Sequence, residues 1–303
     1  MYEIYLPLGR VTTEKTVFFV CLCTHLSLFL HSEKNESMTK ALFFDIDGTL
    51  VSFRTHEIPA STIEALTAAK AKGHHIFIAT GRPRIIISNL GALQERGLID
   101  GYITMNGAYC FVGNEVIYKS PIPESDVHTL TNYCQERNIP CIVVGEHDIC
   151  ACQPDQRVQE VFYEQLKVTV PIPTSHLPEA IEGKEVYQLT PFLVETEERE
   201  ISPFTPNCEM GRWHPAFVDV TAKGNTKQKG IDEIIRHFGI RLEDTIAFGD
   251  GGNDIPMLRH AGIGIAMGNA ADTVKAAADY VTDTVDNDGI AKAIEQWVMK
   301  NDK

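Results

Sequence analysis

The strongest constraint on the fold is a regular alternation of apolar segments and helical segments at both ends of the chain. Apolar runs at 41–46 and 75–79 have the length and composition of buried parallel strands. A helix is expected at 59–72, and another is expected to start at 80–83. This order predicts an α/β fold built on a doubly wound parallel sheet. The alternation returns after residue 223, with strands expected at 245–248, 262–266 and 280–281 and helices at 229–238, 255–260, 271–278 and 289–299.

The middle of the chain breaks this alternation. Short strands are expected at 102–105, 109–112 and 116–119, and strands and helices then mix irregularly while prolines cluster. We therefore expect a second, inserted domain that divides the parallel sheet in sequence. The expected divisions are a first part of the core at 38–120, an inserted α/β cap domain at 121–221 and a second part of the core at 222–303.

Residues 1–37 are expected to be an extension outside the fold. Their apolar stretch at 17–30 is too short for a transmembrane helix, and no A-x-A cleavage signal follows it. Met38 directly precedes a clean strand, so we expect it to be the true start of the protein. A signal peptide and a structured N-terminal element are the alternatives.

The net charge of the chain limits the partners that it can bind, and its cysteines indicate the redox compartment. The 303 residues carry a formal net charge of −14, and an acidic chain repels nucleic acid and anionic membranes. The eight cysteines form no C-x-x-C pair and suit a reducing compartment. We expect a cytoplasmic monomer that binds neither nucleic acid nor membrane.

Two aspartates, Asp45 and Asp47, follow the first predicted strand. Ligands of an open parallel sheet bind at the carboxyl ends of its strands. Residues two apart on a strand point to the same side, so these carboxylates would repel each other unless a cation lay between them. Oxygen ligands at close quarters suit Mg²⁺. One carboxylate can attack phosphorus while the other handles a proton.

Two further clusters also follow predicted strands. Thr80 and Gly81 combine a hydroxyl with the free N–H groups of a helix start, which can seat a phosphate, although a plain helix cap is the alternative. The glycines of 249–254 allow a tight turn, and Asp250 and Asp254 add oxygen ligands. The same composition is common in ordinary turns.

Three lysines lie where the alternation of strands and helices resumes after the predicted insert. One of them could point into the site and neutralise phosphate charge, or all three could form a solvated basic turn. They are Lys223, Lys227 and Lys229.

Together these segments resemble the four motifs of the haloacid dehalogenase (HAD) phosphatases. The matching segments are D-I-D-G-T at 45–49, T-G-R at 80–82, a lysine near 227 and G-D-G-G-N-D at 249–254. The resemblance covers nearly all of 38–303. Two more segments, I-T-M-N-G-A at 103–108 and A-M-G-N-A at 266–270, look like the Cof-type (class IIB) branch, close to its bacterial sugar-phosphate phosphatases. Such proteins have a Rossmann-like core with a mixed α/β cap inserted between the second and third motifs.

The resemblance implies a reaction. Asp45 would form an aspartyl-phosphate, while Asp47 would protonate the leaving group and later activate water. The catalytic lysine would be Lys227, because lining up V-T-A-K-G with the family favours it over Lys223. HAD dehalogenases lack the acid–base residue that Asp47 provides, so the resemblance implies a phosphatase.

The resemblance also implies a set of binding residues. Mg²⁺ would be the cofactor, held by Asp45, the backbone carbonyl of Asp47 and Asp250, with Asp254 supporting the motif. The phosphate would be bound by Thr80, Gly81, Lys227 and Asn253.

The expected function is Mg²⁺-dependent hydrolysis of small phosphate monoesters, above all hexose and other sugar phosphates. A sugar phosphomutase or phosphotransferase of the same superfamily is the nearest alternative, and the acceptor, water or a second sugar hydroxyl, separates the two. A signalling module that is phosphorylated on an aspartate and a sugar-phosphate binding protein are alternatives from other classes.

Several residues near the expected site are not assigned a role. Tyr187, Trp213 and Phe217 are aromatics of the kind that usually packs in a core, with one or two of them facing the sugar as the alternative. Asn106 and Gly107 are expected to form a turn only, to position a hinge of the cap or to reach into the site.

Overall fold

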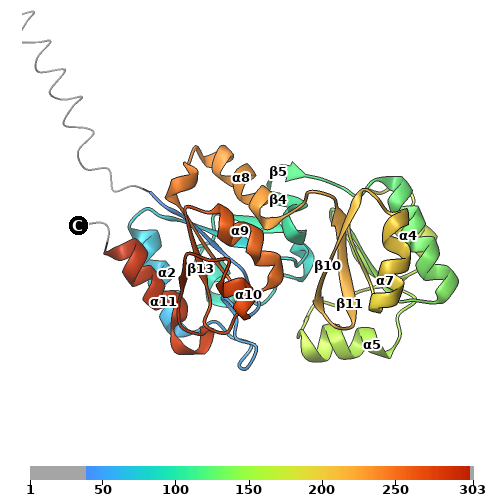
Figure 1. The fold of residues 1–303 in the computed structure, drawn as a ribbon, viewed down its shortest axis with the longest axis horizontal. Coiled ribbons are helices and arrows are strands. Elements are labelled where there is room, and N and C mark those ends of the chain that lie inside the picture. The colour runs from blue at the N-terminus through green and yellow to red at the C-terminus, as the bar shows by residue number, and fades with distance from the viewer. Residues whose placement is uncertain (1–38, 301–303) are drawn as a thin grey trace, which may run out of the picture. The chain divides into compact units, whose positions relative to one another are not determined.

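The computed structural model describes residues 39–300, so the expectations for 1–37 lie outside the described residues. Its main sheet has eight strands in the order β14-β13-β12-β1-β2-β3-β4-β5 (Figure 1). The first six run parallel, whereas β4 and β5 add an antiparallel edge. The strands are β1 (Ala41–Phe44), β2 (His75–Ala79), β3 (Gly101–Thr104), β4 (Tyr109–Val112), β5 (Glu115–Lys119), β12 (Thr245–Gly249), β13 (Ile263–Ala266) and β14 (Tyr280–Val281).

Helices cover both faces of this sheet, as the predicted doubly wound fold requires. Alternate residues of β1 face opposite sides, so Leu42 and Phe44 pack in one apolar cluster and Ala41 and Phe43 in another. The helices α2 (Ala60–Ala71) and α11 (Gly289–Ile294) contribute to the first cluster. The second contains residues of α8 (Lys227–Phe238), α9 (Ile255–His260) and α10 (Asp272–Lys275).

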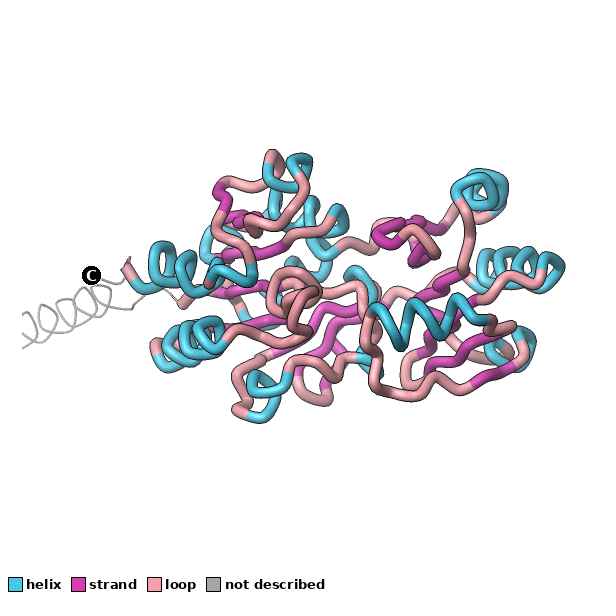
Figure 2. The backbone as a smooth tube through the Cα atoms, turned by 90° about the horizontal axis from the view of Figure 1, so that it is seen from below, coloured by secondary structure: helices cyan, strands magenta, loops and turns pink. Residues whose placement is uncertain are grey.

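A second sheet has six strands in the order β10-β11-β9-β6-β7-β8. All of its neighbours pair antiparallel except β7 and β8. Its strands lie between the two halves of the main sheet in sequence, and helices accompany the strands of both sheets (Figure 2). The predicted α/β insert is therefore present, while its limits at 121 and 221 stay predictions. The strands are β6 (Cys141–Gly145), β7 (Ile149–Cys152), β8 (Thr174–Ser175), β9 (Val186–Pro191), β10 (Cys208–His214) and β11 (Phe217–Ala222).

Helices and turns of the insert complete the fold. They are α4 (Glu124–Arg137), α5 (Gln156–Val158), the π-helical turns Gln159–Gln165, α6 (Leu177–Ile181) and α7 (Glu195–Ile201). Outside the insert, a further π-helical segment, Glu295–Met299, directly follows α11 at the end of the described residues.

The helix expected to start at 80–83 does not form there. Pro83 is extended, and it is followed by a single 3₁₀ turn at Arg84–Ile86 and a short helix, α3 (Gly91–Glu95). A residue before proline is disfavoured in helical conformation, which explains the delayed start. The N–H of Arg82 instead donates to the Thr80 hydroxyl at 3.1 Å.

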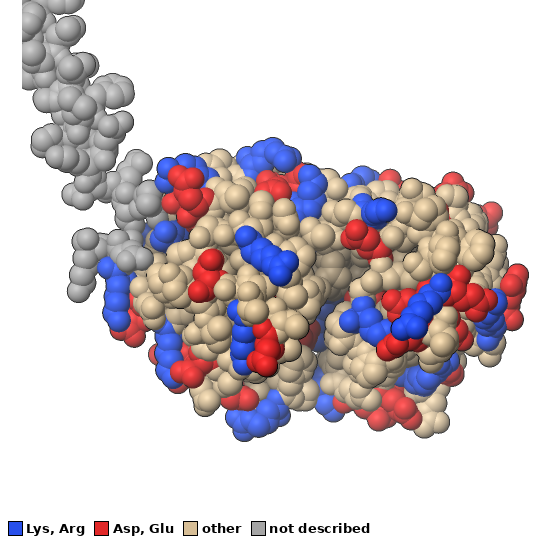
Figure 3. All heavy atoms as spheres, viewed as in Figure 1, with Lys and Arg blue, Asp and Glu red and all other residues tan. Residues whose placement is uncertain are grey.

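Charged side chains of both signs are mixed on the face in view (Figure 3). Lys and Arg side chains there are interspersed with Asp and Glu rather than gathered in one patch (Figure 3). None of the helices among residues 39–300 combines the length and hydrophobicity needed to cross a bilayer.

Candidate active site

A pocket of about 240 Å³ opens at the carboxyl ends of β1, β2 and β12. The structure brings most of the sequence-predicted residues together there, because parallel strands end at one edge of a sheet. Its lining residues are Asp45, Asp47, Phe53, Thr80, Gly81, Arg82, Trp213, Asp250, Gly251 and Asn253.

Behind this pocket, Lys227 lies between two carboxylates. Its Nζ donates to Oδ1 of Asp45 and to Oδ1 of Asp254, both at 2.5 Å, and its side chain is 0% exposed. Burial by itself would lower the pKa of Lys227, but the charges of Asp254 and Asp45 outweigh it and raise the pKa. The lysine therefore stays charged and can offset negative charge at the nucleophile. Lys223, the alternative from the sequence, is exposed.

The place of Lys227 depends on how α8 begins. Thr226 caps the helix by accepting from the N–H of Lys229 at 3.1 Å. The backbone of Thr226 lies so close to Gly107 that a Cβ there would come 2.1 Å from the Thr226 carbonyl oxygen. Gly107 also has a positive φ of 97°, which favours glycine. The predicted helix at 229–238 thus begins two residues earlier, and Lys227 is its first residue.

Two buried acids and one half-buried acid form a cluster suited to a divalent cation. Asp45, Asp250 and Asp254 each offer a carboxylate oxygen within 4.8 Å of the others. Asp254 already accepts from the N–H groups of Asp250 and Gly251 and from Lys227, which leaves Asp45 and Asp250 as the better-placed ligands. Such hard oxygen donors fit Mg²⁺.

Electrostatics support this fit. Burial raises the pKa of Asp250 to about 7, and the charge of Asp254 adds to the rise. Burial also raises the pKa of Asp45, against the effect of Lys227 and with that of the neighbouring acids. A bound cation would relieve this repulsion.

Asp47 is held by Arg82. The Nε and one terminal nitrogen of the guanidinium donate to the two carboxylate oxygens at 2.6 and 2.8 Å. A planar two-point contact of this kind fixes the orientation of the carboxylate. The same terminal nitrogen also donates to the carbonyl of Leu166 in the insert at 3.4 Å.

The predicted phosphate-binding residues lie around the pocket. Thr80 and Gly81 line it, and Gly81 lies against Asn106, whose amide would be 3.3 Å from an added Cβ. Asn253 also lines the pocket and donates to Oδ1 of Asn106 at 3.0 Å. Asn106 therefore contacts two residues that line the pocket, and its role there stays a prediction.

Four pocket residues were not predicted as such. Arg82 and Gly251 were quoted within motifs but given no role in binding, and Phe53 was not considered. For Trp213 the sequence left open a place in a core or a place facing the substrate; it is 40% exposed and lines the pocket, whereas Tyr187 and Phe217 are buried. Composition alone cannot separate a packed tryptophan from one that lines a site.

The buried carboxyl of Asp219 should make the unfolding free energy of the protein depend on pH. Burial raises its pKa from 3.8 to about 6, although hydrogen bonds from Trp213, Thr190 and Gln188 oppose the rise. A carboxyl whose pKa is raised on folding contributes stability below its unfolded pKa and loses it as the pH rises through the folded one. Relative to Asp219→Asn, the unfolding free energy of the native protein should fall by about 2 kcal/mol between pH 4.5 and 7. Chemical denaturation of both proteins at several pH values measures this difference, and parallel curves would contradict it.

The chain matches the family model of haloacid dehalogenase-like hydrolases over residues 42–294. Among curated proteins, it is 37% identical over 258 residues to YkrA of Bacillus subtilis (strain 168), whose name carries the word phosphatase; the match covers 85% of this chain and 97% of that protein. It is 30% identical to the pyridoxal phosphate phosphatase YbhA of Escherichia coli (strain K12), over 84% of this chain and 97% of that one.

Solved structures give the same result. The chain is 66% identical to the HAD subclass IIB sugar phosphatase BT4131, with a TM-score of 0.81 over 86% of this chain and 99% of that one. It is 36% identical to the phosphatase BT1666 of Bacteroides thetaiotaomicron, with a TM-score of 0.75 over 87% and 96% of the two chains.

Proposed function

Because the chain belongs to the haloacid dehalogenase-like hydrolase family, we propose that it hydrolyses small phosphate monoesters, above all sugar phosphates, through an aspartyl-phosphate on Asp45. The observation that carries the proposal is the pocket where Asp45, Asp47 and Asp250 meet with Lys227 buried behind them. Its volume of about 240 Å³ suits a small ester. The likeness to the sugar phosphatase BT4131 supports the substrate class.

The reaction has two balanced steps. A carboxylate oxygen of Asp45 bonds to phosphorus while the bond from phosphorus to the ester oxygen breaks. Asp47, which enters this step protonated and released from Arg82, gives that oxygen its proton. Asp47 then takes a proton from water as the water oxygen bonds to phosphorus, and the bond to Asp45 breaks to release inorganic phosphate.

Charge at phosphorus is balanced by the surrounding groups. Lys227 offsets negative charge at the nucleophile, and Thr80, Gly81 and Asn253 bind the phosphoryl oxygens. Asp45, the carbonyl of Asp47 and Asp250 would hold Mg²⁺, which supplies further charge neutralisation when bound.

Phosphate release from a panel of hexose, pentose and triose phosphates and nucleotides tests the proposal. We expect release from sugar phosphates that requires Mg²⁺ and stops with EDTA. Product analysis in the presence of a second sugar would detect transfer to a hydroxyl, which favours the phosphotransferase alternative. No release from any member by the folded protein would overturn the hydrolase proposal. Monomeric state and cytoplasmic location stay predictions from the sequence.

Asp47→Asn should make the rate depend on the leaving group. An alkoxide needs a proton to leave, so kcat with a sugar phosphate should fall roughly 10²- to 10⁴-fold. With p-nitrophenyl phosphate, whose leaving group is stable as an anion, the loss should be much smaller. Asp244→Asn, which disturbs the Arg241–Asp244 pair outside the pocket, is the matched control and should leave both rates unchanged. Equal losses on the two substrates would argue against proton donation by Asp47.

A further inference from the structure

A second pocket adjoins the active-site pocket, and we call it the distal pocket. The two share Gly81, Arg82 and Trp213 as lining residues. Most of the remaining wall is apolar and comes from the insert, including Ile142, Val144 and Leu166. Its cavity volume of about 30 Å³ accommodates a hydroxyl group or a water, but not a sugar ring.

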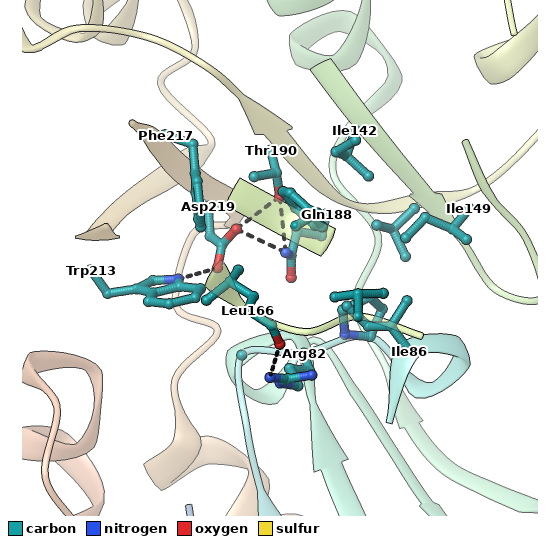
Figure 4. Close-up of a pocket in the computed structure, with 15 residues that line it drawn as sticks. Arg82, Ile86, Ile142, Ile149, Leu166, Gln188, Thr190, Trp213, Phe217 and Asp219 are labelled. Atoms are coloured by element: carbon teal, nitrogen blue, oxygen red, sulfur yellow. Dashed lines mark hydrogen bonds between the residues drawn. The ribbon is translucent and has the colours of Figure 1, made fainter. Parts of the chain in front are cut away.

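One polar atom in this wall has no partner. Gln188 is only 3% exposed, and its Oε1 makes no hydrogen bond within the described part of the chain. Its Nε2 donates to Oδ1 of Asp219 at 3.0 Å and lies 3.1 Å from the Thr190 hydroxyl. A carboxylate only accepts, so this contact fixes which end of the amide faces Asp219. The oxygen is therefore turned away from Asp219 (Figure 4).

The carboxylate of Asp219 also orients Trp213, whose ring lines both pockets. The indole Nε1 of Trp213 donates to Oδ2 of Asp219 at 2.7 Å, and its ring packs edge-on against Phe217 with centroids 5.0 Å apart. Asp219 thus orients both the unpaired amide and the aromatic side chain that the pockets share. A buried acceptor without a donor destabilises a protein unless a ligand or water supplies one.

We propose that the distal pocket binds one hydroxyl-bearing carbon of the leaving group, whose hydroxyl donates to Oε1 of Gln188. This inference rests on the proposed function and assigns specificity to residues of the insert. The apolar wall accommodates the carbon, and the amide oxygen accepts the hydroxyl proton. A second phosphate or a carboxylate is disfavoured beside Gln188, because the side chains of Gln188 and Asp219 present acceptor oxygens there.

A set of deoxy substrates tests the inference. Glucose 6-phosphate is compared with its 1-, 2- and 3-deoxy analogues on the native enzyme and on Gln188→Met, which keeps the length of the side chain without its amide. Removing the hydroxyl that reaches Gln188 should lower kcat/KM roughly 10- to 100-fold in the native enzyme. The same removal should cost less than about 3-fold in Gln188→Met.

Gln156→Met is the matched control. It removes the amide of an exposed glutamine that pairs with Glu160 outside both pockets, so the native preference should persist. Hydrolysis of all four substrates with equal kcat/KM by the native enzyme would overturn this inference alone and assign the pocket to a water. A penalty that persists in Gln188→Met would also overturn it. If the native enzyme hydrolyses none of these four substrates and no other phosphate ester, the proposed function itself is overturned.

Discussion

Asp45→Asn is expected to abolish turnover while leaving the fold as stable as before or more stable. Loss of the nucleophile should lower kcat roughly 10⁴- to 10⁶-fold, the range found when a nucleophile is removed from a catalytic unit. The pKa of Asp45 is raised by burial, so its charged form is disfavoured in the folded protein. Removing that charge should raise the unfolding free energy by about 1 kcal/mol in metal-free buffer.

The two effects of this variant have opposite signs, which separates a functional acid from a structural one. Asp100→Asn is the control, since Asp100 pairs with Lys70 and accepts from the N–H of Ile76 outside the pocket. It should lose stability and keep its rate. Phosphate release and denaturant unfolding measure both quantities. An Asp45→Asn protein that retains a tenth of the native rate, or unfolds much more readily, would contradict the assignment.

The positions of the acids could be predicted because they depend on one general rule. Asp45 and Asp250 follow apolar strands directly, and the carboxyl ends of parallel strands meet at one edge. Neither prediction needed the order of the strands. The split of the main sheet by an insert was predictable for a similar reason, since the alternation of strand and helix stops and then returns.

The rest of the site depends on contacts between distant residues. Arg82 forms an ion pair with Asp47, which lies 35 positions away in the sequence, and no local sequence pattern predicts a contact over that separation. Trp213 lies on β10, an edge strand whose residues alternate between half-buried and exposed, so its ring is free to line a pocket. Local propensity also misplaced the helix start at 80–83, because Pro83 and the Thr80 hydroxyl favour an extended turn there.

Lys227→Met is expected to cost both activity and stability. The substitution removes the cation between Asp45 and Asp254, and Asp254 is completely buried. Leaving buried carboxylates without their partner typically costs about 3–5 kcal/mol of unfolding free energy. Lys229→Met is the control, because Lys229 pairs with Glu233 near the surface, where such a pair contributes about 1 kcal/mol or less. Equal effects of the two substitutions would argue against a special place for Lys227.

Combining Lys227→Met with Asp45→Asn tests why Lys227→Met loses stability. If the cause is the charge of buried carboxylates left without a cation, removing one of these carboxylates should restore part of the unfolding free energy. The double variant leaves only Asp254 without its cation, so it should be more stable than Lys227→Met alone by about 2–3 kcal/mol, which is more than Asp45→Asn gains by itself. Its activity should stay abolished, because the nucleophile is gone. A recovery of stability larger than the effect of Asp45→Asn by itself would show that Lys227 acts on the fold by balancing the charge of Asp45. Simple additivity of the two stability effects would contradict this coupling, since each substitution would then act without reference to the other.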